Sequence, residues 1–204
     1  MVSLSRVLSA VGLLFLAGCV STQFAVVTAG QVALDDLSVS ATDSGWNKAP
    51  QTVAPWLHPT SEVWTRDGVL LDRLILVPGV ENGGTLFKSN SDALVYPEYR
   101  SGMLPNEVAD LTVSSIQKLL GTDTAVTMED LRPHRLGDQR AVMFDLNIEA
   151  GEMPRRQARV LAFMHEDRLY LLAFIATALH YFDKHWDAAL AVMDSARTLA
   201  PQDA

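Results

Sequence analysis

The feature that most constrains the fold of this chain is a series of four strand-like segments in its C-terminal half, with only short turns between them. The segments span residues 125–131, 140–149, 157–165 and 168–177. Such short turns join antiparallel neighbours, because parallel strands need a crossover of about a dozen residues or more. The stretch from Leu169 to Ala178 is almost wholly apolar, which predicts a central strand that is buried on both faces.

Helices and further strands flank this series. Asp67-Gly68 supplies the positive φ of a tight turn, so residues 62–65 and 69–77 are predicted to form a hairpin. Residues 105–120 and 181–199 have the apolar periodicity of amphipathic helices. The order of strands, helix, antiparallel strands and helix predicts an α+β fold, in which helices pack on a twisted antiparallel β-sheet.

The N-terminus has the pattern of a bacterial lipoprotein signal. Arg6 precedes an apolar run that ends in Leu16-Ala17-Gly18-Cys19, which contains the only cysteine. The run is too short to cross a bilayer, which takes about 20 apolar residues. We therefore expect residues 1–18 to be a signal peptide, residues 19–31 to form the lipidated N-terminus with a tether or first strand, and residues 32–200 to form a single α+β domain.

Acylation of Cys19, with palmitate for example, would anchor the protein in the bacterial cell envelope. Residue 20 is Val rather than the Asp that resembles an inner-membrane retention signal, so we expect the periplasmic face of the outer membrane. The formal net charge of −8 makes the chain unsuited to nucleic acid, which is bound by clustered basic residues. The expected partners are the membrane, through the lipid at Cys19, and an envelope protein.

The C-terminal part also resembles a known fold family. An apolar strand, Leu169–Phe174, runs into Phe182-Asp183-Lys184-His185-Trp186 and an amphipathic helix with Asp194-Ser195-Ala196-Arg197, as in PsbP-like domains. The Trp-Thr-x-Asp-Gly hairpin, here Trp64 to Gly68, is similar to that of proteobacterial lipoproteins. The resemblance covers roughly Leu37 to Leu199. It implies an αβα sandwich, and accessory or protein-binding roles more often than catalysis.

Two groups of side chains are candidates for binding. The first is the set Trp46, Trp56 and Trp64, because tryptophan is enriched at binding hot spots. Each of these large rings would serve equally well to pin a core. The second is the basic group Arg155, Arg156 and Arg159 beside Pro154, which suits an acidic partner or the phosphate of a glycan. The alternative is an exposed hairpin tip whose charges protect an edge strand.

Catalytic patterns are incomplete. His180 and Asp183 lie one helical turn apart, and His165 would have to join them from a neighbouring strand. Without His165, the pair His180 and Asp183 supplies two ligands, fewer than the three or four that zinc sites use. A helix start, with Asp183 near the positive end of the dipole and His185 in solvent, explains the same residues. We expect no catalytic residue, no metal site and no cofactor.

These observations predict a lipid-anchored envelope protein that acts as a non-catalytic binding or assembly module. One alternative is a hydrolase-like envelope enzyme that uses His180, Asp183 and His165. The other is a carrier of a small apolar ligand, held between the sheet and the Trp-rich loop.

Overall fold

A computed structural model describes residues 23–89, 91 and 94–199 of the chain. The predicted signal peptide and Cys19 lie outside these residues, as do residues 20–22 of the predicted tether.

The main element is an eight-stranded sheet in which every neighbouring pair is antiparallel. Its strands lie side by side in the order β1 (Ala25–Val26), β4 (Asn47–Lys48), β5 (Glu62–Thr65), β6 (Asp72–Val80), β10 (Arg168–Thr177), β9 (Arg156–His165), β8 (Gln139–Ala150) and β7 (Thr124–Leu136). A smaller sheet has the order β11 (Arg197–Thr198), β3 (Leu37–Ala41) and β2 (Gly30–Leu34), and a 3₁₀ turn, η1, spans Gln51–Val53.

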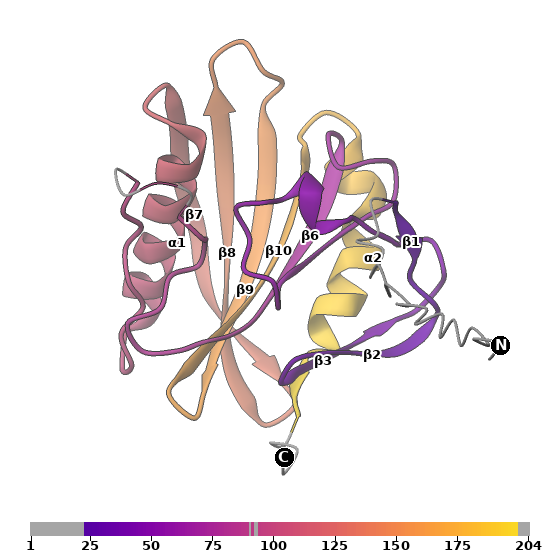
Figure 1. The fold of residues 1–204 in the computed structure, drawn as a ribbon, viewed down its shortest axis with the longest axis horizontal. Coiled ribbons are helices and arrows are strands. Elements are labelled where there is room, and N and C mark those ends of the chain that lie inside the picture. Colours follow the sequence, from indigo (N-terminus) through magenta and orange to yellow (C-terminus); the bar gives the residue numbers. More distant parts are fainter. Residues whose placement is uncertain (1–22, 90, 92–93, 200–204) are drawn as a thin grey trace, which may run out of the picture.

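The two helices cover opposite faces of the large sheet. Helix α1 (Pro105–Leu120) packs against β7 and β8, whereas α2 (Tyr181–Asp194) packs against β10, β6 and β9 and also meets β3 of the small sheet (Figure 1). Because side chains alternate along a strand, Ile75 and Val77 enter the core under α1, while Leu74 and Leu76 enter the core under α2. These layers confirm the predicted α+β fold with helices packed on an antiparallel sheet.

The apolar strand predicted to be central is central. Strand β10 lies between β6 and β9, and most of its residues are buried while none is exposed. Leu171 and Ala173 belong to the core under α1, and Leu172 and Phe174 to the core under α2. A strand that contributes to two cores has no face for water, which explains its continuous apolar sequence.

The last helix is shorter than predicted. It ends at Asp194 rather than near Leu199, because the Ser195 hydroxyl donates to the Val192 carbonyl and accepts the backbone N–H of Ser40. The chain then extends, and Arg197–Thr198 pairs with β3. A contact distant in sequence thus ends the helix earlier than its apolar periodicity predicts.

The predicted hairpin forms with a longer connection. Strand β6 begins at Asp72 rather than residue 69 and continues past Pro78 to Val80. The register with β10 shifts between Leu169 and Leu171, and such a bulge lets a strand contain a proline. In the described part of the chain, no helix has the length and apolar character needed to span a membrane.

Candidate functional site

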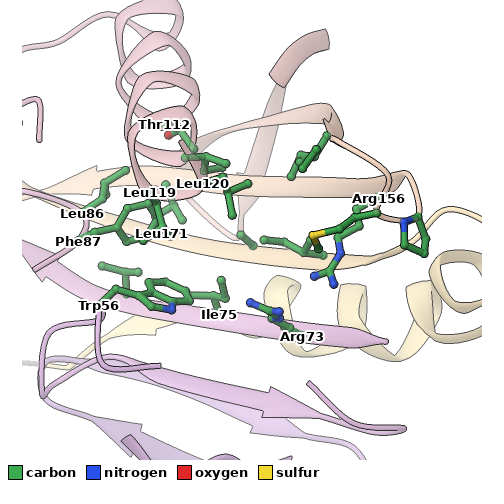
Figure 2. Close-up of a pocket in the computed structure, with 18 residues that line it drawn as sticks. Trp56, Arg73, Ile75, Leu86, Phe87, Thr112, Leu119, Leu120, Arg156 and Leu171 are labelled. Atoms are coloured by element: carbon green, nitrogen blue, oxygen red, sulfur yellow. The ribbon is translucent and has the colours of Figure 1, made fainter. Parts of the chain in front are cut away.

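A cavity of about 120 Å³ lies between the α1 face of the sheet and the C-terminal half of α1 (Figure 2). It draws side chains from the four strands β6, β10, β9 and β8, from α1, from the β8–β9 turn and from the segments around Trp56 and Phe87. The lining residues are Trp56, Arg73, Ile75, Val77, Leu86, Phe87, Thr112, Ile116, Leu119, Leu120, Ile148, Ala150, Met153, Pro154, Arg156, Leu171, Ala173 and Ile175.

Strand alternation builds the floor of this cavity. Ile75 of β6 pairs with Ala173 of β10, and both face α1. Ala173 is small where its strand neighbours on the same face, Leu171 and Ile175, are large. A methyl side chain in the middle of the floor leaves volume that a larger residue would fill, which accounts for a hollow in an otherwise close-packed layer.

Aromatic rings form one end of the cavity. Trp56 meets Phe87 edge to face with 5.1 Å between ring centroids, and Phe87 meets Tyr96 at 5.7 Å. The edge-to-face arrangement is the favourable one for aromatic pairs. It holds the half-buried Trp56 in place as a rigid apolar wall.

The rim of the cavity is open and apolar. Leu120 at the end of α1 is 47% exposed, and Met153 in the β8–β9 turn is 55% exposed. Both line the cavity, so its apolar surface continues to solvent rather than closing inside the core.

Arg73 and Arg156 are the only charged residues among the described side chains that line the cavity. Their guanidinium groups lie together at one end, with Trp56, Leu86 and Phe87 at the other (Figure 2). Arg73 Nε donates to the Val69 carbonyl at 2.6 Å, and an Arg156 Nη donates to the Leu70 carbonyl at 3.1 Å. Consecutive carbonyls of the β5–β6 connection therefore hold both groups at the same place.

The electrostatics of this end are unusual for arginine. Burial, and then the neighbouring Arg156 cation, lower the pKa of Arg73 to about 10. Burial also lowers the pKa of Arg156. Both shifts mean that the fold disfavours the positive charge that these residues carry at neutral pH.

The three predicted tryptophans do not form one cluster. Trp46 and Trp64 are fully buried in the core under α2, on the opposite side of the sheet from Trp56. Trp64 follows Val63 in a strand, and alternation sends the two side chains to opposite faces. Of the three, only Trp56 contributes to the cavity, and Trp46 and Trp64 occupy core positions.

The three predicted arginines separate for the same reason. Arg156 lies on the α1 face at the cavity, whereas Arg159 lies on the α2 face, where it makes two hydrogen bonds to Asp145 and stacks 4.3 Å from the Trp186 ring. Arg155 is exposed at the strand end, and one of its Nη groups donates to Asn147. They do not form a single basic patch.

The hydrolase-like group does not assemble. His165 pairs with Arg168 at the start of β10, whereas His180 and Asp183 follow the other end of that strand. Ten extended residues separate these ends by about 30 Å. His180 and Asp183 are exposed.

A different polar cluster joins the β5–β6 connection to α2. Asp67, Asp72 and His185 are the one group among the described residues that brings three potential metal ligands together. Its acceptors are already occupied, since Asp72 accepts from the Thr65 hydroxyl and from two backbone N–H groups, and Asp67 accepts from Lys184 and His185. His185 is buried, not in solvent as predicted. We assign this cluster a structural role.

The molecule has a PsbP-like and Mog1-like fold. The solution structure of cyanobacterial PsbP (CyanoP) from Synechocystis sp. PCC 6803 matches it with a TM-score of 0.57 and 12% sequence identity, over 90% of this chain and 98% of that one. A mutant of the protein Mog1 matches with a TM-score of 0.51 and 10% identity, over 86% of this chain and 98% of that one. No family model and no curated protein sequence matches the chain. The structural similarity confirms the PsbP-like αβα architecture.

Sequence reasoning missed Arg73. The sequence pattern could have identified it, because Arg73, Ile75 and Val77 share one face of a strand whose other face carries Leu74 and Leu76. A charged residue on an otherwise apolar strand face indicates that this end of the face contacts solvent or a polar group.

Proposed function

We propose that this protein is a lipid-anchored, non-catalytic binding module of the bacterial cell envelope, and that it holds a small ligand with an apolar part in the cavity beneath α1. The anchor would be the acyl group on Cys19, at the periplasmic face of the outer membrane. The leader sequence supports this anchoring, and the cavity supports the binding.

The observation that carries the proposal is a cavity of about 120 Å³ whose lining is almost entirely apolar and whose rim opens to solvent. An engineered core cavity of about 150 Å³ is large enough to take up benzene. The cavity in this protein, of about 120 Å³, is of similar size and suits a small ring or a stretch of alkyl chain. An apolar pocket with a few polar groups at one end is the usual form of a small-molecule site.

The test is calorimetric titration of octan-1-ol into the full chain held in phosphatidylcholine nanodiscs, with empty nanodiscs as the blank. We expect saturable binding with one site per chain. Ala150→Leu places a larger side chain on the cavity lining and should weaken binding about tenfold or more, since each buried methylene is worth about 0.8 kcal/mol. Ala125→Leu, on the exposed side of the adjacent strand β7, is the matched control and should leave affinity unchanged.

If the wild-type chain binds neither octan-1-ol nor an eight-carbon acid (octanoate or octyl phosphate) beyond the blank, the binding proposal is wrong. If both leucine variants weaken binding equally, the ligand does not occupy the cavity, and the proposal is again wrong.

A second candidate function is assembly with an envelope protein. Three large apolar side chains are exposed at the end of the sheet where β10 ends and β9 begins: Leu70 (72%), Met153 (55%) and Leu179 (89%). Backbone hydrogen bonds from Thr177 to Leu71 and from Ala178 to Arg155 join these loops. Crosslinking in intact cells should enrich one partner with the wild-type chain and lose it with Leu179→Asp. An unchanged crosslinking pattern in that variant would remove this candidate.

A further inference from the structure

We propose that the cavity ligand is an amphipathic anion, with its carboxylate or phosphate head group bound between Arg73 and Arg156 and its alkyl chain lying among the apolar side chains. This inference rests on the proposed binding function and specifies the chemical class of the ligand.

No acidic side chain in the described part of the chain neutralises the two guanidinium groups. Among the described residues, neither Arg73 nor Arg156 forms an ion pair, and each donates only to a backbone carbonyl. Arg156 Nε is buried without a hydrogen-bond partner. Buried charges in proteins are normally paired, because an unpaired one carries the full cost of lost hydration.

The other partly buried arginines among the described residues all have acidic partners. Arg66 pairs with Asp43, Arg132 with Asp130 and Asp145, Arg159 with Asp145, and Arg168 with both Asp36 and Glu81. The sequence holds 24 acidic residues against 16 Lys and Arg, so acidic partners are plentiful. Among the partly buried arginines that the structure describes, Arg73 and Arg156 alone lack an acidic partner, and both line the cavity.

The positions of the two guanidinium groups suit an anion bound between them. The carbonyls of Val69 and Leu70 hold the two side chains at the same end of the cavity, and donor groups on each remain free for a ligand. Guanidinium groups suit carboxylate and phosphate oxygens, because their planar N–H donors make two parallel hydrogen bonds. An anion between them would also relieve the repulsion that lowers the pKa of Arg73.

The rest of the cavity suits an alkyl chain. Beyond the arginines, the lining is apolar as far as Trp56 and Phe87 apart from Thr112, whose hydroxyl donates to the Val108 carbonyl. A free inorganic anion would leave that space unfilled, and a neutral hydrocarbon would leave both cations unpaired. A short alkyl chain that ends in an acid satisfies both ends of the cavity.

The experiment compares three eight-carbon probes in the calorimetric assay above: octanoate, octyl phosphate and octan-1-ol. We expect at least one acid to bind about tenfold or more tightly than the alcohol, because charge-assisted hydrogen bonds are about twice as strong as neutral ones. The tighter of the two acids identifies the head group. Arg73→Met and Arg156→Met should remove this advantage without weakening octan-1-ol. Arg135→Met, at an exposed position outside the cavity, should have no effect.

The outcomes separate the two proposals. Octan-1-ol that binds as tightly as both acids overturns the anion proposal and leaves the binding function standing. Acid affinity that survives both arginine variants also overturns it, because the head group then binds elsewhere. Failure of all three probes overturns the binding function itself.

Discussion

Replacement of Arg73 by methionine should make the ligand-free protein more stable. Most substitutions of a half-buried residue destabilise a protein, so an increase is a distinctive expectation. It follows from the surroundings of Arg73, which place a cation among apolar side chains and next to a second cation. Methionine keeps the apolar stem of the side chain and removes the charge.

The expected gain can be worked from the pKa of Arg73. That pKa is about 10, against roughly 12.5 for an unperturbed arginine. At about 1.4 kcal/mol for each tenfold change in proton affinity, the charged form carries a penalty of about 3 kcal/mol in the folded state. Methionine also loses the hydrogen bond to the Val69 carbonyl, which is worth about 1 kcal/mol.

The net expectation is therefore a gain of about 2 kcal/mol. For a chain of this length each kcal/mol raises the melting temperature by about 2–4 °C, so the variant should melt about 4–8 °C higher. The penalty is present in full well below pH 10, because both the folded and the unfolded state are then protonated. The gain should accordingly be constant between pH 6 and pH 9.

The assay is differential scanning calorimetry of the delipidated full chain, wild type against Arg73→Met, with Arg135→Met as the control for removal of an exposed positive charge. Addition of the acid that binds best should raise the melting temperature of the wild type more than that of Arg73→Met, which should respond to the acid only as much as to octan-1-ol. A melting temperature of Arg73→Met at or below that of the wild type would refute the reasoning, because it would mean that the fold itself already satisfies the charge of Arg73.

Three further predictions address other parts of the molecule. Phe174→Ala should lower the free energy of unfolding by about 3–5 kcal/mol in a urea titration, because Phe174 is fully buried against Trp46 and Phe182; a loss under 1 kcal/mol would contradict this packing. Hydrogen bonds from Lys184 and then His185 lower the pKa of Asp67, so Asp67→Asn should reduce the melting temperature slightly at pH 7. That difference should vanish as the pH falls through the lowered pKa, and a difference that persists there would exclude a role for the carboxylate charge. Cys19→Ser should abolish incorporation of an alkyne-labelled palmitate in cells, and labelling that survives would disprove acylation at Cys19.

Local signals in the sequence identified most of the fold. Helix α1 occupies residues 105–120, as predicted, because the positions of Pro105, Gly121 and the apolar stripe between them are all local. The four strand segments were also found, since period-two alternation and turn residues are properties of neighbouring positions. The early end of α2 was missed, because Ser195 is held by Ser40, a residue far away in the sequence.

The candidate site was only partly visible in the sequence. Trp56 and Arg156 were singled out, each within a group whose other members point elsewhere. Grouping by closeness in sequence fails in strands, because neighbouring residues face opposite sides of the sheet. The carrier hypothesis placed a ligand between the sheet and the Trp-rich loop, whereas the cavity lies between the sheet and α1 and receives only Trp56 from that loop.

The sequence by itself determined the order of the elements, the central apolar strand and the leader that predicts an anchor at Cys19, because hydrophobic period, turn chemistry and signal motifs are read over a few residues at a time. Only the tertiary structure decided that Arg73 and Arg156 share one end of a cavity with Trp56 at the other. The physical reason is that the sheet places β6, β10 and β9 side by side, so side chains distant in the sequence meet on one face, and whether a charge there has a partner depends on every strand around it.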